Sequence, residues 1–290
     1  MPRPLRALGI RRILSLLVPL LSGERTNAAR VYTRLGEKAF LGERTRYLNL
    51  GWWDEARSHD AAADALAEQL GLAAGMAPGD TVLDVGFGFG DQDEYWLRRF
   101  QPARIVGLNV TPLHVDAARR RFPDPRLDFR HGSATAMALP DAAADRVTAL
   151  ECAFHFVTRE DFFREAFRVL KDGSRLATAD VLPRPGRWPL TARALVAYLR
   201  AFFQIPSENW YDRDAYRRKL EETGFVDVEV RSVREQVLLP FWDATRRLLR
   251  SPAGAHVWSW PLRQAARVPS RWFDGIDYVI ASARRPPRSG

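Results

Sequence analysis

The sequence of 290 residues predicts an α/β fold, a doubly wound sheet of seven mostly parallel strands with helices on both faces. Beyond residue 80, short apolar runs alternate with amphipathic stretches, and this alternation is typical of strand–helix repeats in a parallel sheet. The first apolar run ends in a turn with three glycines, a feature of ligand-binding sheets of this class. Hydrophobic residues make up 46% of the chain and charged residues 27%, which fits a globular core.

Seven apolar runs are expected to form the strands. They span residues 81–85, 103–108, 127–130, 146–151, 175–179, 225–232 and 277–282. Helices are expected over residues 92–100, 112–121, 159–170 and 213–223. These elements are enough for a complete doubly wound sheet.

We expect one domain over residues 25–290, with two additions to the sheet. Residues 25–76 have a helical pattern and should form a cap before the first strand. Residues 182–212 follow the fifth strand and are too apolar and aromatic for a plain loop. They are predicted to form an inserted lid.

The first 24 residues form a basic, apolar arm. They contain four arginines, no acidic residue before Glu24, and an apolar run over residues 13–21 that is too short to cross a bilayer as a helix. Three interpretations compete: an amphipathic helix that lies on a membrane or packs on the domain, a secretory or twin-arginine signal peptide, and an organelle transit peptide. Because no A-x-A cleavage site follows the run, we favour the retained helix, for which a peripheral membrane contact is one of the two placements.

Cysteine usage and charge limit the class of protein. Cys152 is the only cysteine, which excludes an internal disulfide framework and a cysteine-based zinc site and favours the cytoplasm. The net charge of +9 is compatible with nucleic acid, with an anionic membrane surface or with an arginine-rich proteome. No arginine run is interleaved with aromatic residues on a strand, so we expect no nucleic-acid partner.

The stretch VLDVGFGFGDQ, residues 82–92, is the main local signal. Gly86 and Gly88 allow the backbone to turn sharply and to approach a ligand where a Cβ would interfere. Such a turn can open a dinucleotide site, a methyl-donor site, or only a tight strand-to-helix connection. Asp91 stands where a dinucleotide motif has its third glycine, and Asp84 lies within the strand. Both acids carry negative charge and would disfavour a pyrophosphate, so a zwitterionic or cationic ligand is expected.

In chain order, the segments VLDVGFGFG, IVGLNVT, DFRHGSATAMALP and DRVTALECAFHF resemble the class I S-adenosylmethionine-dependent methyltransferases, whose fold is Rossmann-like. YLNLGWWD upstream, with IPSENWYDRDAYRRKLEETGFVDVEVRSVREQV and DYVIASAR downstream, is similar to the small-molecule branch that includes the erythromycin-type macrolide O-methyltransferases. The resemblance spans residues 47–284. It implies S-adenosylmethionine as the cofactor and a methyl transfer that requires no metal.

The resemblance also implies which residues hold the methionine end of the cofactor. They are Asp84, at its base, with Gly86, Gly88, Gly90 and Gln92. Tyr47, together with Asn49 and Trp52, resembles the segment that folds over this end and excludes water. As bare side chains, these three are equally compatible with the core.

The rest of the cofactor is placed in the same way. Asn109 ends the second strand where the family usually has an acid that binds the ribose hydroxyls; alternatively, it caps the helix that begins near Thr111. Ser133 and Ala134 match the adenine position. Glu151 ends the fourth strand beneath the sulfonium region.

For the chemistry, His155 is a candidate general base oriented by Asp180 at the end of the fifth strand. The alternative is that His155 is an ordinary packed residue. The favoured function is methyl transfer from S-adenosylmethionine to a small, largely apolar acceptor, with a hydroxyl of a natural product as the first choice. A methyltransferase for a membrane lipid, quinone or isoprenoid, on carbon, nitrogen or oxygen, is the second. A non-catalytic binding protein with the same fold is the third.

Overall fold

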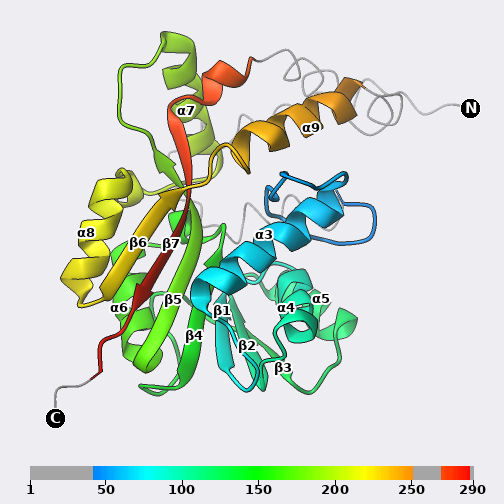
Figure 1. The fold of residues 1–290 in the computed structure, drawn as a ribbon, viewed down its shortest axis with the longest axis vertical. Helices are drawn as coiled ribbons and strands as arrows, with labels where there is room; N and C mark the ends of the chain where they lie inside the picture. The colour runs from blue at the N-terminus through cyan, green and yellow to red at the C-terminus, as the bar shows by residue number, and fades with distance from the viewer. Residues whose placement is uncertain (1–41, 251–268, 288–290) are drawn as a thin grey trace, which may run out of the picture.

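The structure, a computed structural model, describes residues 42–250 and 269–287 (Figure 1). Within these residues, one sheet of seven strands has the order β3-β2-β1-β4-β5-β7-β6. The strands are β1 Thr81–Val85, β2 Arg104–Asn109, β3 Leu127–His131, β4 Ala144–Leu150, β5 Leu170–Pro183, β6 Val226–Ser232 and β7 Ile276–Arg284. Strands β1 to β5 are parallel, and β7 runs antiparallel to both of its neighbours. The predicted fold class is confirmed.

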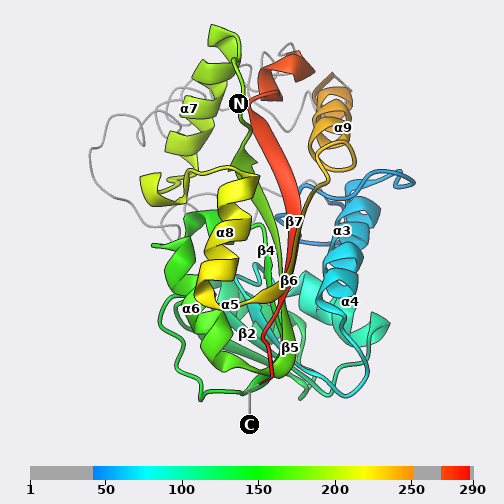
Figure 2. The same ribbon diagram turned by 60° about the vertical axis from the view of Figure 1, so that its left-hand side comes forward.

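Helices cover both faces of the sheet. Figure 2 shows α3 and α4 on one side and α6 and α8 on the other. The described helices are α3 His59–Ala74, α4 Asp91–Arg99, α5 Pro112–Arg121, α6 Arg159–Val169, α7 Leu190–Phe202, α8 Arg213–Thr223 and α9 Leu238–Arg250. Short 3-10 turns are η2 Ala153–His155, η3 Ser207–Asn209 and η4 Ser270–Phe273. The bounds of α5 and α8 agree with those predicted from the sequence.

Strand β1 is central and buried on both faces. Val82 packs in the cluster with Leu66 and Leu70 of α3, and Leu83 packs in the opposite cluster with Phe162 of α6. A strand covered on both sides needs a continuous apolar run, which is why TVLDV stands out in the sequence. Because the strand order runs outward from β1 in both directions, its carboxyl end marks the point where ligands bind in such sheets.

Strand β5 is longer than the predicted residues 175–179. Its pairing with β7 continues from Arg175 opposite Arg284 to Pro183 opposite Ile276. The first two residues of the predicted lid, 182 and 183, therefore belong to the sheet, and α7 and η3 follow them. A lid function for this segment stays a prediction. Of the predicted cap, α3 is described, and residues 25–41 lie outside the described residues, as does the arm 1–24.

A buried ion pair joins β5 to α6. The Arg159 Nε lies 3.0 Å from the Asp180 Oδ2, and both side chains are fully buried. The Asn209 Oδ1 accepts from the Arg159 N–H at 2.9 Å, and its carbonyl accepts from the Arg159 Nη1 at 2.8 Å. The Asn209 amide group donates to the carbonyls of Phe154 and Phe156 at 3.1 and 2.7 Å. This network fixes the loop after β4 to the residues that follow α7.

Replacing Asp180 by Asn should destabilise the protein strongly, because the Arg159 guanidinium stays buried without its counter-charge. We expect a loss of about 3–5 kcal/mol in the free energy of unfolding, measured by urea denaturation. The matched control is Asp141→Asn. It removes the carboxylate that pairs with Arg168, and the Asp141 side chain is 67% exposed. That change should cost about 0–1 kcal/mol. Equal losses in both variants would show that the buried Arg159–Asp180 pair stabilises the protein no more than an exposed pair.

Candidate active site

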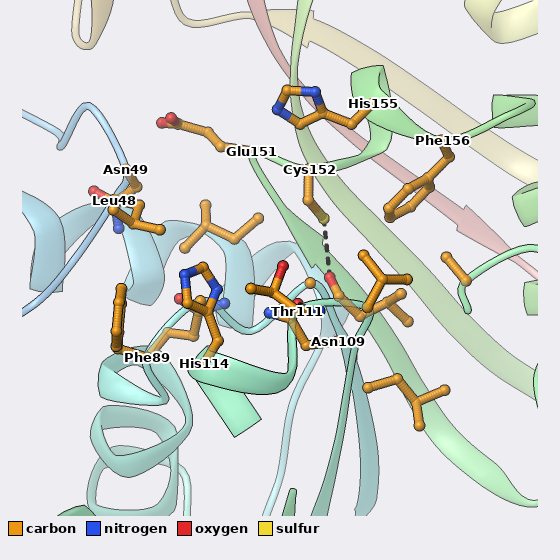
Figure 3. Close-up of a pocket in the computed structure, with 18 of the residues that line it drawn as sticks. Leu48, Asn49, Phe89, Asn109, Thr111, His114, Glu151, Cys152, His155 and Phe156 are labelled. Carbon is orange, nitrogen blue, oxygen red and sulfur yellow. Dashed lines mark hydrogen bonds between the residues drawn. The ribbon is translucent and has the colours of Figure 1, made fainter. Parts of the chain in front are cut away.

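A cavity of about 280 Å³ opens beyond the carboxyl ends of β1, β2 and β4. Loops after these strands line it together with cap residues 46–49 (Figure 3). The predicted site residues that line it are Tyr47, Gly86, Gly88, Gln92, Asn109, Ser133, Ala134, Glu151 and His155. Asp84, Gly90 and Asp180 do not line it, and each has another role.

Gly86 occupies a position that only glycine can fill. Its φ is +79°, and its N–H donates to the Leu108 carbonyl at 2.7 Å. A Cβ at this position would lie 2.6 Å from both the Cβ and the Sγ of Cys152. The Cys152 thiol is itself held by a hydrogen bond to the Val85 carbonyl at 2.9 Å. The bare backbone therefore forms the floor of the cavity because the loop after β4 lies directly behind it.

Gly90 is needed for packing and does not line the cavity, so its predicted contact with the cofactor stays a prediction. Its φ is +84°, and a Cβ there would lie 2.9 Å from the Phe129 Cζ and 3.1 Å from the Ala118 Cβ. The missing side chain lets the start of α4 approach β3 and α5.

Asp84 lies behind the glycine turn and does not line the cavity. It is fully buried and accepts from the Gln92 Nε2 at 2.8 Å and the Thr148 Oγ1 at 2.9 Å. Burial raises its pKa, and burial together with the charge of Asp84 raises the pKa of the neighbouring Asp93. Asp84 acts on the cavity indirectly, by orienting the Gln92 amide that lines it.

The cap segment is fixed to the domain at two points beside the cavity. The Tyr47 hydroxyl lies 3.2 Å from the carbonyl oxygen of Asp91 in α4 and donates to the Asp64 Oδ1 of α3 at 2.7 Å, and Tyr47 is 4% exposed. Three residues on, the Leu50 N–H donates to the Glu151 Oε1 at 2.8 Å. The same oxygen accepts from the Tyr278 hydroxyl of β7 at 2.7 Å. Glu151 thus connects the cap, the end of β4 and the antiparallel strand.

Glu151 has both a left-handed backbone conformation and a raised pKa. Its φ of +52° directs the chain from β4 into the loop that contains η2. Burial raises the pKa of Glu151 to about 7, although the hydrogen bonds from Leu50 and Tyr278 act in the opposite direction. Near neutral pH, this side chain is divided between its protonated and ionised forms.

The other wall contains the residues predicted for ribose and adenine. The Asn109 Oδ1 accepts from the Thr111 N–H at 2.9 Å, so the local capping interaction is present at a residue that also lines the cavity. The Ser133 hydroxyl accepts from the Thr135 N–H at 3.2 Å and lies 3.1 Å from the Thr135 hydroxyl. Ala134 is 4% exposed and presents an apolar surface between them.

His155 lines the cavity, but Asp180 does not orient it. Asp180 is bound by Arg159 and lies 3.4 Å from the Tyr216 hydroxyl, so the predicted His155–Asp180 pair is wrong. His155 lies in η2, with its ring centroid 4.2 Å from that of Phe154 and with a backbone hydrogen bond at Phe203. Burial lowers the pKa of His155 to about 4, so the ring is neutral at pH 7.

Several cavity residues were missed by sequence reasoning. The rings of Phe89 and His114 lie with centroids 4.3 Å apart and form part of the wall. Asp91 accepts two hydrogen bonds of 2.6 Å from Arg121 of α5, so the negative charge noted in the sequence is paired with an arginine. The aromatic residue between Gly88 and Gly90 was the available signal, whereas the partners from α5 require the tertiary structure.

The described residues contain neither a metal-binding cluster nor a membrane-spanning helix. No cluster of three or more His, Cys, Asp or Glu side chains there has a geometry that could hold a metal ion. None of the helices in the described part of the chain is both long and apolar enough to cross a membrane.

Gly86→Ala should weaken the binding of S-adenosylmethionine, the ligand implied by the resemblance, about tenfold or more. The matched control is Gly79→Ala, because Gly79 has a similar φ of +87° and nothing within 4 Å of an added Cβ. Both changes place an alanine in a left-handed conformation, which costs about 1–2 kcal/mol, but only the change at residue 86 displaces Cys152. Calorimetric titration measures the difference. Equal affinities in the two variants would show that the cavity floor does not contact the ligand.

Glu151→Gln should stabilise the protein increasingly as the pH rises from 4.5 to 7. In this window the unfolded wild-type chain has lost the proton and the folded chain retains it, so wild-type stability falls with pH. The amide has no charge to bury, and the difference in unfolding free energy should grow by about 3 kcal/mol and stay constant above pH 7. Urea denaturation of both proteins across this range measures it. A difference that does not change with pH would place the Glu151 pKa at its ordinary value.

Comparisons with known proteins agree with the geometry. Residues 83–178 match the family model described as a methyltransferase domain. Over 256 residues the chain is 41% identical to erythromycin 3''-O-methyltransferase from Saccharopolyspora erythraea, covering 83% of this chain and 84% of that protein. It is 29% identical to 27-O-demethylrifamycin SV methyltransferase from Amycolatopsis mediterranei, covering 82% of this chain and 90% of that one.

Solved structures support the fold. Geranyl diphosphate C-methyltransferase from Streptomyces coelicolor, in complex with S-adenosyl-L-homocysteine, superposes with a TM-score of 0.69 at 21% identity and covers 90% of this chain and 98% of that one. The cofactor of this protein is S-adenosylmethionine, and its acceptor is a small molecule. The chain belongs to the S-adenosylmethionine-dependent methyltransferases, in the small-molecule branch that includes erythromycin 3''-O-methyltransferase.

Proposed function

We propose that this enzyme methylates a hydroxyl group of a bulky, largely apolar natural product of the macrolide kind. The observation that carries the proposal is a cavity with an apolar mouth and two polar side chains, Glu151 and His155, on the same side (Figure 3). The 41% identity to an enzyme named for O-methylation of erythromycin supports it, as does the similarity to one that acts on 27-O-demethylrifamycin SV.

The residues present fit S-adenosylmethionine. A Cβ at Gly86 would overlap Cys152, so the backbone at this position is bare, and it lines the cavity where a ligand can approach it closely. We assign Gly86, Gly88 and Gln92 to its methionine end, under the cover of Tyr47. When bound, the cofactor supplies an electrophilic methyl group on a sulfonium.

Asn109 is proposed to hydrogen-bond the ribose with its amide group, since its Oδ1 is engaged by the Thr111 N–H. Ser133 and Ala134 are proposed to contact the adenine, as expected from the resemblance. An amide in place of the family's usual acid accepts fewer hydrogen bonds from the ribose hydroxyls. We therefore expect the ribose to contribute less to affinity here.

The mouth of the cavity is proposed to receive the acceptor. Leu48, Val110 and Val157 line the cavity and are 36%, 42% and 67% exposed. Large apolar side chains left in water beside a cavity favour an apolar partner that covers them. His155 lies deeper than this rim and is neutral, so it can hydrogen-bond a hydroxyl without the cost of burying a charge.

Most of the rate acceleration should come from positioning and water exclusion, because the methyl group passes directly between two bound molecules that must be held in line. The cap segment, held by Glu151 through Leu50, closes one side of the cavity. The α7 segment approaches from the other side through the Phe203 backbone at His155.

Three predictions about location and partners stay predictions. They are a peripheral membrane contact through residues 1–24, which lie outside the described residues, a cytoplasmic location and the absence of a nucleic-acid partner. A prenylated or lipid acceptor is the second candidate, because the same exposed apolar rim would accommodate it.

The test is to incubate the enzyme with methyl-labelled S-adenosylmethionine and two panels, hydroxylated macrolides with their glycosides and prenylated quinols. We expect label on a hydroxyl oxygen of the first panel. On that acceptor, Val157→Asp should raise KM about tenfold with little change in the affinity for S-adenosylmethionine, because a charge then stands in the apolar mouth. Leu72→Asp is the control, since Leu72 is 53% exposed and lies on α3 away from the cavity. Label on carbon, or only on the prenylated panel, would overturn the proposal.

A further inference from the structure

We propose that Glu151 is the catalytic base that takes the proton from the acceptor hydroxyl, an inference that rests on the proposed O-methylation. The sequence assigned this task to His155 and Asp180 and placed Glu151 among the cofactor contacts. The structure distributes these three side chains differently.

The two oxygens of Glu151 have different surroundings. Both protein donors, the Leu50 N–H and the Tyr278 hydroxyl, bind Oε1. Among the described residues, no group donates to Oε2, and the side chain is partly exposed where it lines the cavity. One oxygen therefore holds the carboxyl in place while the other is available to a ligand.

The other candidate groups are engaged or poorly suited. Asp180 is fully buried against Arg159 and lies outside the cavity. Asp91 is the second acid that lines the described cavity, and both of its oxygens accept from Arg121. His155 has a low affinity for a proton, because burial lowers its pKa to about 4.

The charge environment of Glu151 favours reversible protonation near neutrality. A base is most effective when its pKa lies near the working pH, and burial raises that of Glu151 to about 7. The polar and titratable groups that face it come from the cap, β7, β5 and the loop after β4. They are the Leu50 N–H, Tyr278, Asp180 and Cys152, and His155 lines the same cavity. Asp180 raises the pKa of Glu151 further, and the two hydrogen bonds lower it.

The chemical step balances with this assignment. The acceptor O–H bond breaks, the proton goes to the Glu151 Oε2, and the electron pair stays on oxygen. That oxygen forms its new bond to the methyl carbon of the sulfonium, and the broken C–S bond leaves its electron pair on sulfur. The neutral carboxylic acid of Glu151 then returns its proton to water. His155 is left to orient the hydroxyl by a hydrogen bond.

The experiment compares wild type, Glu151→Gln and His155→Gln on the acceptor found above. The wild-type kcat/KM should rise with pH through an inflection near or just below 7. Glu151→Gln should lower kcat about 10²–10⁴-fold and remove the inflection. Its affinity for S-adenosylmethionine, measured by calorimetry, should change less than threefold, since the amide Oε1 can still accept from Leu50 and Tyr278. His155→Gln should keep the inflection.

Glu165→Gln is the matched control, because Glu165 of α6 binds the Met137 N–H and Arg168 outside the cavity. It should leave both rate and pH profile unchanged. The proposal is overturned if Glu151→Gln keeps the inflection, if His155→Gln alone removes it, or if Glu151→Gln shows no pH-dependent gain in stability between pH 4.5 and 7. The stability measurement needs no acceptor, so it separates failure of this assignment from failure of the proposed function.

Discussion

The ion pair between Arg159 and Asp180 is the interaction on which the geometry of the active site depends. A buried ion pair relies on further hydrogen bonds to its partners, which makes such a network cooperative. Here Asn209 accepts from the Arg159 N–H and Nη1 and donates to the carbonyls on both sides of His155. The loop after β4, which lines the cavity, is therefore positioned from the interior of the protein and not from its surface.

Three carboxyls near the carboxyl ends of neighbouring strands show how environment divides similar residues among different tasks. Asp84 on β1 holds Gln92, Asp180 on β5 neutralises a buried arginine, and Glu151 after β4 lines the cavity. All three have pKa values raised by burial, but only Glu151 has an oxygen outside the hydrogen-bond network. Burial thus identifies the group of candidates, and the partners of each oxygen identify its role.

The dependence of these roles on tertiary partners explains which features could be predicted from the sequence. The strands, helices and glycine turn follow from local patterns, so β1, α5 and α8 were predicted with their observed bounds, and nine of the twelve predicted site residues line the cavity. The roles of Gly90 and Asp180 depend on what lies across the sheet or behind the turn. Phe129 and Arg159 are those partners, and no periodicity connects them to Gly90 or Asp180. The length of β5 was underestimated for the same reason, since its pairing with β7 continues past its apolar centre.

The position of β7 between β5 and β6 has a consequence for how the protein is made. On the ribosome, β6 emerges before β7 and cannot join the sheet, because its described strand partner is β7. Tyr278, the donor that holds Glu151, arrives in the same late strand. A nascent chain can therefore assemble β1 to β5 with a glycine turn in place but with only one of the two donors that hold Glu151, the Leu50 N–H. On this topology, competence for catalysis would come with the final pairing event, after most of the core has already formed.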